Sequence, residues 1–331
     1  MRRLLPLLLL LLAPVAPAAA QPFSFAAFGD VPYCRPWAPR ECVEQEARVA
    51  DLMQDLNRAN PAFTVHVGDT IGGSELCTDE KLLRAFAFFT LANHPLVYTP
   101  GDNEWTDCWR DFAGRYAPQE RLAFLRARYF RDASSLGRRP MPLLRQADVD
   151  PAHPALVENA RWVRNAVVFA TLHVTGSNNG RPGIPGDTPV VPQAPGALAE
   201  YEARHAANLA WLEATFADAT RAAAPAVVVM VQADLFYVAR CGRGYDSGYA
   251  DFRSALARHA AAFGRPVLLV HGDSHFWLHD RPIATAPNLT RIMVPGDQDV
   301  RAVMVAVDPS AAEPWSFTFI GRDDRMARPG C

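Results

Sequence analysis

Carboxylates, amides and one histidine follow five short apolar runs of this chain, and these residue types bind metal ions. The runs are rich in β-branched and aromatic residues, which is typical of buried strands. Polar residues directly after strands lie where α/β folds usually place their ligands. A single Gly-Asp is often only a turn, but five such stretches together predict a metal site. They are FGDVPY at residues 28–33, VGDT at 67–70, PGDNEW at 100–105, VQAD at 231–234 and HGDSHFW at 271–277.

Helical segments between the apolar runs predict an α/β fold. The first half is expected to form a βαβαβ run, because helical spacing of apolar residues separates its strands. This run has strands at 23–28, 63–67 and 96–99 and helices at 41–60 and 79–92. Alternation returns in the second half with a helix at 198–216, a strand at 226–231, a helix at 249–263 and a strand at 267–270, before three final strands at 290–294, 303–307 and 316–320.

Two proline-containing segments without periodicity, residues 131–159 and 176–196, are expected to be long surface loops. Between them, residues 162–174 are expected to form a hairpin that turns at Arg164 and Asn165. Long loops in compact domains often form functional rims. Because no polar linker divides the chain, we expect one domain over residues 21–331.

The N-terminus has the pattern of a signal peptide at residues 1–20. Arg2 and Arg3 precede an apolar run that is too short to span a bilayer, and small residues offer a cleavage site before Gln21. We therefore expect a periplasmic or secreted protein, not held by a membrane after cleavage, and a monomer. Removing two of the 33 basic residues leaves 31 against 35 acidic ones, a net charge of −4 that gives no reason to expect nucleic acid as a partner.

All six cysteines follow the predicted signal peptide, so we expect export to oxidise them. Six cysteines allow 15 connectivities. The pair Cys34–Cys42 would bracket the loop after the first strand, and the pair Cys77–Cys108 would join the loops after the second and third, so these two are favoured. A thiolate metal site is the alternative, but the chain contains no CxxC pair.

The order and spacing of the five motifs resemble those of the calcineurin-like metallophosphoesterase superfamily, which includes purple acid phosphatases. The segment NLAWLEATF at residues 208–216 is also similar to the helix that precedes the family's fourth motif, and the resemblance covers nearly all of the mature chain. It implies a four-layer αββα sandwich, in which two mixed β-sheets are flanked by helices. It also implies divalent metal ions, two of them in the family pattern.

The resemblance assigns metal ligands position by position, and most family histidines are replaced here. Asp30 matches the first Asp, and Asp69 matches the carboxylate that bridges two metals. In the third motif Asp102 matches the Asn ligand and Asn103 the catalytic His; an alternative register places Asn103 on the ligand and Glu104 on the His. The remaining matches are Gln232 at the fourth-motif His, and Asp273 and His275 at the two histidines of the last motif.

The replacements still offer mostly oxygen donors, so the site is expected to favour Mn²⁺, Mg²⁺ or Ca²⁺ over Zn²⁺. The alternative is a metal-free remnant whose side chains hydrogen-bond one another. By resemblance, a metal-bound hydroxide would hydrolyse a small phosphate ester by in-line displacement. Asn103 cannot protonate the leaving group, so Glu104 or a histidine such as His173 would have to serve.

Four further residues are candidates for substrate binding at the rim of the site. Asn178 and Asn179 could donate to substrate oxygens, although an Asn pair before glycine is also an ordinary turn. Arg110 and Arg145 are candidate phosphate clamps.

Two other functions remain open. A non-catalytic protein could use the same pocket to bind a metal or a phosphorylated ligand. A hydrolase of the GDS type would use Ser274 as its nucleophile, but in such enzymes this motif follows the first strand.

Overall fold

The computed structural model describes residues 21–185, 193–322, 325–326 and 330. The predicted signal peptide lies outside these residues, as does part of the second long loop. In the part of the chain described, no helix is long and apolar enough to cross a membrane.

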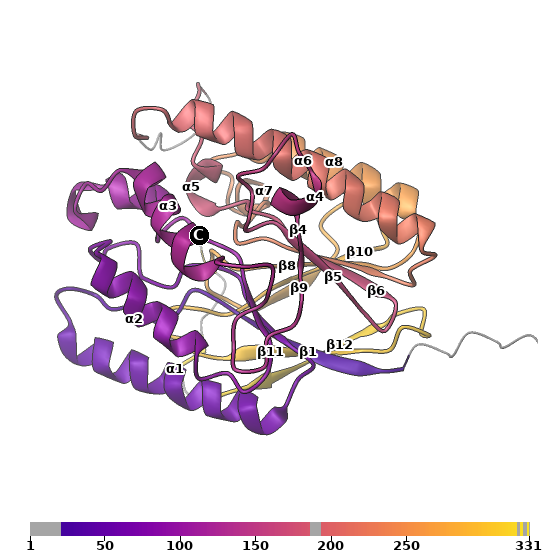
Figure 1. Cartoon of the computed structure of the whole chain (residues 1–331), viewed down its shortest axis with the longest axis horizontal. Coiled ribbons are helices and arrows are strands. Elements are labelled where there is room, and N and C mark those ends of the chain that lie inside the picture. Colours follow the sequence, from indigo (N-terminus) through magenta and orange to yellow (C-terminus); the bar gives the residue numbers. More distant parts are fainter. Residues whose placement is uncertain (1–20, 186–192, 323–324, 327–329, 331) are drawn as a thin grey trace, which may run out of the picture.

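Two mixed β-sheets form the centre of the molecule (Figure 1). The first has the order β12-β11-β1-β2-β3, in which β1, β2 and β3 are parallel and β11 and β12 are antiparallel to their neighbours. Its strands are β1 Phe23–Phe28, β2 Thr64–His66, β3 Leu96–Tyr98, β11 Ala302–Val307 and β12 Trp315–Ile320.

The second sheet has the order β4-β5-β6-β7-β8-β10-β9, and its central strands β6, β7, β8 and β10 are parallel. Its strands are β4 Leu144–Arg145, β5 Ala160–Arg164, β6 Val167–Thr171, β7 Val227–Met230, β8 Val267–His271, β9 Leu278–Asp280 and β10 Leu289–Met293.

Helices cover the outer face of each sheet, so the molecule has the predicted four layers (Figure 1). Helices α1, α2 and α3 pack on the first sheet, and α6 and α8 pack on the second. Between the sheets, Phe25 and Val65 of the first share a fully buried core with Val228 and Leu268 of the second. The helices are α1 Pro39–Ala59, α2 Asp79–Phe89, α3 Pro118–Tyr129, α4 Gln146–Val149, α5 Gly176–Asn179, α6 Ala197–Arg221, α7 Tyr237–Cys241 and α8 Ala250–Phe263, with 3₁₀ turns at Thr106–Trp109 and Asp111–Ala113.

Local sequence explains where the first two helices begin and end. Helix α1 starts at Pro39, whose missing N–H costs nothing in a first turn, and ends at Ala59, before Asn60, which caps the helix in the left-handed conformation and precedes Pro61. Helix α2 begins at the N-cap Thr78, whose hydroxyl accepts a hydrogen bond from the backbone N–H of Lys81 at 3.2 Å.

The structure confirms the predicted βαβαβ run and corrects two details. The hairpin of β5 and β6 turns at Asn165 and Ala166, both with positive φ, one residue later than predicted. The loop at residues 131–159 contains β4 and α4, which are too short to produce a periodic pattern. The predicted disulfides Cys34–Cys42 and Cys77–Cys108 are both present.

Candidate metal centre

The candidate ligands lie at the carboxyl ends of parallel strands in both sheets. Asp30 follows β1, Asp69 follows β2, and Asp273 and His275 follow β8. All four adopt left-handed backbone conformations, with φ of 56°, 58°, 77° and 67° respectively. A non-glycine residue in this region costs roughly 1–3 kcal/mol and persists only where its surroundings impose it, often at functional sites. The fold therefore concentrates backbone strain at these four residues.

Two glycines of the Gly-Asp motifs are required because a carboxylate lies against their backbone. A Cβ at Gly101 would come within 1.9 Å of Asp69 Oδ1, and one at Gly272 within 2.2 Å of Asp30 Oδ2. No other side chain fits at either position without moving a candidate ligand. The glycines thus allow loops from different strands to approach the same carboxylates.

Asp30, Asp69 and His275 form a compact group, which we call the Asp30 cluster. Each offers one ligand atom, and these atoms lie within 4.8 Å of one another. Both carboxylates are buried, whereas the His275 side chain is partly exposed. His275 Nε2 lies 3.6 Å from Asp30 Oδ1. In the described part of the chain, the one other such group contains the disulfide-bonded Cys34 and Cys42.

Tyr33 joins the members of the Asp30 cluster, and the sequence analysis did not identify it. Its hydroxyl donates to Asp69 Oδ2 at 2.8 Å and lies 3.5 Å from Asp30 Oδ1 and 3.2 Å from His275 Nε2. It also accepts a hydrogen bond from Asn103 Nδ2 at 3.1 Å. The motif FGDVPY contains this tyrosine, three residues after Asp30. Nothing in the motif distinguishes it from a core residue.

Burial and mutual repulsion make the carboxylates costly to ionise without a counter-charge. Desolvation, followed by the charge of Asp273, raises the pKa of Asp30 well above its ordinary value. Desolvation and the charge of Asp102 likewise raise the pKa of Asp69, and raise that of Asp273 to about 8. Burial lowers the pKa of His275, which keeps its ring neutral and able to act as a ligand. A cation would stabilise the ionised form of this group.

The GDNE loop gives its polar residues different environments. Asn103 donates from its side chain to Asp69 Oδ2 at 2.8 Å and from its backbone to Asp69 Oδ1 at 3.2 Å. Glu104 is fully buried, and its Oε1 accepts from the backbone N–H groups of Asp69 and Gly101 and from the Tyr98 hydroxyl. Glu104 therefore holds two loops together through Oε1, whereas its Oε2 is buried without a hydrogen-bond partner among the described residues and burial raises the pKa of the carboxyl. Its role as a proton donor stays a prediction.

Asp102, Gln232 and Asp273 meet on the other side of the site, around the segment that follows β6. Gln232 is fully buried, and its Oε1 accepts from the backbone N–H of Gly176. Asp102 Oδ2 accepts from the Ser177 hydroxyl at 2.7 Å. Asp273 donates its backbone N–H to both oxygens of Asp30, so the two halves of the site are connected.

His173 has an environment different from the predicted rim. It is fully buried, and its Nδ1 lies 2.8 Å from Glu158 Oε1, while Glu158 also pairs with Arg126. Its ring packs edge-on against Trp105 with centroids 5.1 Å apart. Burial lowers the pKa of His173. These contacts correct the prediction, because His173 belongs to a buried ion-pair network rather than to a surface open to substrate.

Asn178 and Asn179 are also buried, and their amides hold their own loop in place. Asn178 Oδ1 accepts from the backbone N–H of Gly248 at 2.8 Å, and Asn179 Oδ1 accepts from the Arg204 guanidinium. The predicted substrate contacts are therefore corrected to loop-positioning contacts.

The two candidate phosphate clamps lie in different places. Arg110 pairs with Asp107 at 2.6 Å and donates to the Ser177 hydroxyl at 3.0 Å, which places it beside the site. Arg145 lies in β4, pairs with Asp148 and donates to the Phe130 carbonyl, so these contacts do not favour its predicted role.

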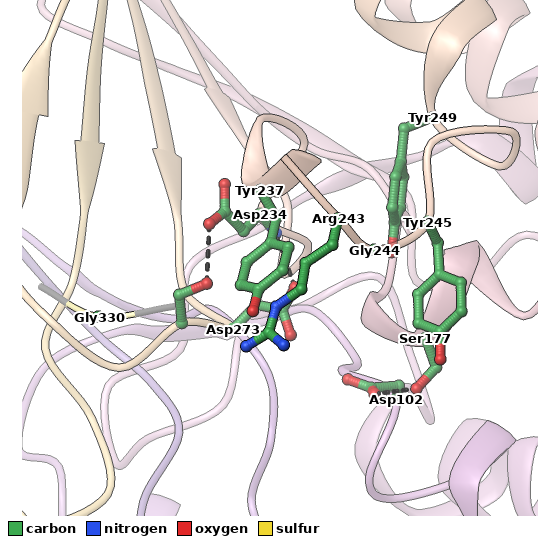
Figure 2. Close-up of a pocket in the computed structure, with 11 residues that line it drawn as sticks. Asp102, Ser177, Asp234, Tyr237, Arg243, Gly244, Tyr245, Tyr249, Asp273 and Gly330 are labelled. Atoms are coloured by element: carbon green, nitrogen blue, oxygen red, sulfur yellow. Dashed lines mark hydrogen bonds between the residues drawn. The ribbon is translucent and has the colours of Figure 1, made fainter. Parts of the chain in front are cut away.

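A cavity of about 490 Å³ opens beside Asp102 and Asp273. In the view of Figure 2, Ser177 is hydrogen-bonded to Asp102 below the rings of Tyr245 and Tyr249. The complete lining is Asp102, Ser177, Asp234, Tyr237, Arg243, Gly244, Tyr245, Tyr249, Asp273, Ser274 and Gly330. No motif marked these tyrosines as site residues, because Tyr237 and Tyr245 follow β7 in a segment without regular spacing and Tyr249 opens the predicted helix at 249–263.

Ser274, the alternative nucleophile, lies at this cavity. Its hydroxyl donates to Asp234 Oδ2 at 2.7 Å and accepts from Arg240 at 3.2 Å. Asp234 is itself paired with Arg240. The Ser274 hydroxyl thus contacts the Asp234–Arg240 ion pair rather than a histidine base. These surroundings do not favour a GDS-type hydrolase.

Two mixed sheets between helical layers, with the motif residues at the carboxyl ends of the strands, define the fold of the calcineurin-like metallophosphoesterases. A dimetal phosphatase from Danio rerio matches with a TM-score of 0.52 and 12% identity, over 91% of this chain and 99% of its own. Purple acid phosphatase PPD1 from yellow lupin (Lupinus luteus) seeds matches with a TM-score of 0.50 and 12% identity, over 94% of this chain and 55% of its own. No protein-family model and no curated protein sequence matches the chain.

Proposed function

We propose that this protein is a metal-dependent phosphoesterase that hydrolyses a small phosphate ester. The observation that carries the proposal is the convergence of Asp30, Asp69 and His275 within 4.8 Å at the strand ends. The fold is that of solved structures described as a dimetal phosphatase and a purple acid phosphatase. Fold alone does not define an activity, so the proposal rests on the site.

The residues of the Asp30 cluster fit a divalent cation. Burial and neighbouring carboxylates raise the pKa of both Asp30 and Asp69, and a neutral imidazole stands beside them. Such a donor set is costly to bury without a positive charge, and a bound cation would remove that cost. The two carboxylate donors favour Mn²⁺, Mg²⁺ or Ca²⁺ over Zn²⁺, whereas the single imidazole is a donor that Zn²⁺ also accepts.

In this proposal, residues of the chain have separate roles in binding the cation, orienting its ligands and accommodating the substrate. Asp30, Asp69 and His275 would hold the cation, which would act as a Lewis acid toward a phosphoryl oxygen. Asn103 and Tyr33 fix the orientation of Asp69 through hydrogen bonds to Oδ2. The cavity beside Asp102 has room for a leaving group larger than a methyl alcohol.

Protonation of the leaving group has no evident donor at the position of Asn103. Asn103, at the family's histidine position, has no acidic proton, and Glu104 is fully buried, with its Oε1 accepting three hydrogen bonds inside the protein. We therefore propose that good leaving groups are strongly preferred, because general acid catalysis typically contributes ~10²–10⁴-fold in rate.

A non-catalytic binding protein on the same fold is the second candidate. The observation that favours it is the same absence of an acid at Asn103. A screen of aryl and alkyl phosphate esters with Mg²⁺, Mn²⁺, Ca²⁺ and Zn²⁺, run beside metal analysis, separates the two. Metal binding with no turnover of any ester would support the binding protein and overturn the phosphoesterase.

We further propose that residues 21–331 form one domain that is exported and acts as a monomer. The disulfides Cys34–Cys42 and Cys77–Cys108 support export, because such bonds persist in oxidising compartments. N-terminal sequencing of protein recovered from the periplasm or medium, with gel filtration, tests the proposal. A start near Gln21 and a monomeric elution volume are expected.

A further inference from the structure

Three tyrosines line the cavity beside Asp102 and Asp273, and the proposed metal site gives them no role. Tyr237, Tyr245 and Tyr249 all lie in the segment between β7 and α8. In the view of Figure 2, the ring of Tyr237 is seen beside Asp273 and the ring of Tyr245 beside Ser177. The cavity volume of about 490 Å³ falls within the ~300–1,000 Å³ that is usual for small-molecule sites.

The cavity adjoins the Asp30 cluster through both carboxylates of its wall. Asp273 donates its backbone N–H to Asp30 Oδ1 at 3.0 Å. Asp102 directly precedes Asn103, whose backbone N–H donates to Asp69 Oδ1 at 3.2 Å. A substrate whose phosphoryl group lies at the cluster can therefore place its other half in the cavity.

Gly176 leaves the two wall carboxylates open to a ligand. A Cβ at this position would come within 2.4 Å of Asp102 Oδ1 and 2.8 Å of Asp273 Oδ1. Because glycine has no Cβ, both oxygens face open space. Asp102 Oδ1 is also buried without a hydrogen-bond partner among the described residues. The space between the cluster and the cavity is thus unobstructed at this point.

The segment that carries the tyrosines is tied to the loop after β6. Tyr249 is buried, and its hydroxyl accepts from the backbone N–H of Asn179 and donates to the Thr175 carbonyl, both at 3.2 Å. The backbone N–H of Gly248 donates to Asn178 Oδ1 at 2.8 Å. The tyrosine segment is therefore fixed relative to the wall that holds Ser177.

Tyr237 and Tyr245 each have one side packed on protein and remain partly exposed. Tyr237 packs against Gly244, where φ is 121° and a Cβ would come within 2.9 Å of the ring. The Arg240 guanidinium lies 5.2 Å from the centroid of the same ring. Tyr245 packs against the core between the second sheet and its helices. Both rings are thus held in place before a ligand binds, which lowers the entropy cost of binding.

An aromatic group suits this wall better than an aliphatic or a cationic one. Aromatic rings attract one another beyond the effect of buried area, through stacked or edge-on contacts. A quaternary ammonium group also binds to aromatic side chains, but Arg243 lines the same cavity and would repel it. Asn103 points to the same class of substrate, because a phenolate can leave without the proton that Asn103 cannot supply.

We propose that the substrate is an aryl phosphate whose aromatic leaving group binds against Tyr237 and Tyr245. The inference rests on the proposed function, because it places the phosphoryl group at the Asp30 cluster. In the reaction a water oxygen forms a bond to phosphorus as the bond from phosphorus to the aryl oxygen breaks. The electron pair of the broken bond leaves with the phenolate, and the proton of the water passes to solvent.

Phosphonates, which cannot be hydrolysed, test the inference by binding alone. Phenylphosphonate and cyclohexylphosphonate are titrated calorimetrically into the mature protein in the presence of Mn²⁺, because the two have similar size and only the first has an aromatic face. The variants are Tyr237→Leu and Tyr245→Leu, which keep an apolar side chain. The matched control is Tyr116→Leu, since Tyr116 is partly buried against the core of the first sheet and does not line the cavity.

Phenylphosphonate is expected to bind ~2–10-fold more tightly than cyclohexylphosphonate, the usual gain from an aromatic pair. This ratio should fall toward one in Tyr237→Leu and Tyr245→Leu and stay unchanged in Tyr116→Leu. Phenyl phosphate should also have a lower KM than hexafluoroisopropyl phosphate, whose alcohol is about as acidic as phenol but is not aromatic.

Equal affinity for the two phosphonates, or a ratio that both tyrosine variants keep, would overturn the inference. Tighter binding of a phosphonate that carries a trimethylammonium group would overturn it as well and assign the cavity to a cationic substrate. In either case, metal-dependent hydrolysis of one of the two esters would leave the proposed function intact. Neither phosphonate binding nor hydrolysis of any ester would overturn both.

Discussion

The Tyr33 hydroxyl donates a hydrogen bond to Asp69 Oδ2 at 2.8 Å, although 35 residues separate the two in the chain. The contact connects the loop after β1 to the loop after β2 at the centre of the Asp30 cluster. Tyr33 is buried, and desolvation together with the charge of Asp69 raises its pKa well above the ordinary value, so the phenol keeps its proton to donate.

Tyr33→Phe should weaken Mn²⁺ binding by ~10–100-fold, the usual effect of removing a group that orients a metal ligand. Calorimetric titration measures the change. Tyr98→Phe is the matched control, because the Tyr98 hydroxyl donates to the buried Glu104 instead of to a candidate ligand. The control should keep the Mn²⁺ affinity of the unsubstituted protein. Equal losses in both variants would show that Tyr33 acts only through general stability.

Asn103→His should flatten the dependence of hydrolysis rate on leaving-group pKa, because a histidine there can supply the missing proton. Aryl esters leave unaided, so the gain should fall on alkyl esters and reach ~10²–10⁴-fold. A series of esters with graded leaving-group pKa values measures the slope.

Glu104→Gln should leave that slope unchanged and instead lower stability by ~1–3 kcal/mol, since it buries an amide NH2 where Glu104 Oε2 has no hydrogen-bond partner among the described residues, although the amide oxygen can keep the three bonds of Oε1. Denaturant unfolding gives the stability change. A steeper slope with unchanged stability would mean that Glu104 is the acid and that the alternative register of the GDNE motif is correct.

Loss of the Cys77–Cys108 disulfide should cost ~3–4 kcal/mol of unfolding free energy, because the bond closes a loop with a sequence separation of 31. The comparison is Cys34–Cys42, with a separation of 8, for which ~2–3 kcal/mol is expected. Double Cys→Ala variants of each pair, unfolded in urea, provide the two values. A larger loss for Cys34–Cys42 would contradict the loop-length explanation.

His66 should make the protein less stable as pH falls below about 6.5, the ordinary pKa of histidine. Burial lowers its folded-state pKa to about 3, and its Nδ1 accepts from the Gly68 N–H at 3.2 Å, a bond that protonation would break. The unfolded chain takes up the proton first, so stability is complete above 6.5 and is lost as pH falls toward 3. At pH 5 the loss should be about 2 kcal/mol.

His66→Gln tests this, since glutamine keeps an acceptor but does not titrate. The variant should lose less stability than the unsubstituted protein between pH 7 and pH 5, measured by urea unfolding at each pH. An identical pH dependence in both proteins would show that His66 does not contribute.

The strand-end carboxylates could be predicted because they depend on local pattern: continuous apolar runs mark the strands, and Asp30 and Asp69 follow them directly. The four layers came from the resemblance to a known family, since no local pattern shows how two sheets pack. The roles of Tyr33, Glu104 and Gly176 could not be predicted, because each depends on which loops from distant strands meet. His173 shows the same limit: its position after a strand suggested the rim, but its pairing with Glu158 is a tertiary contact without a local pattern.

The central claim is tested most directly by the metal dependence of ester hydrolysis with Asp69 present and absent. The mature protein and its Asp69→Ala variant are stripped with a chelator and assayed on an aryl phosphate before and after Mn²⁺ is added. The account predicts no hydrolysis without metal, recovery in the unsubstituted protein and no recovery in Asp69→Ala. Equal hydrolysis by both proteins, or hydrolysis that survives chelation, would contradict it.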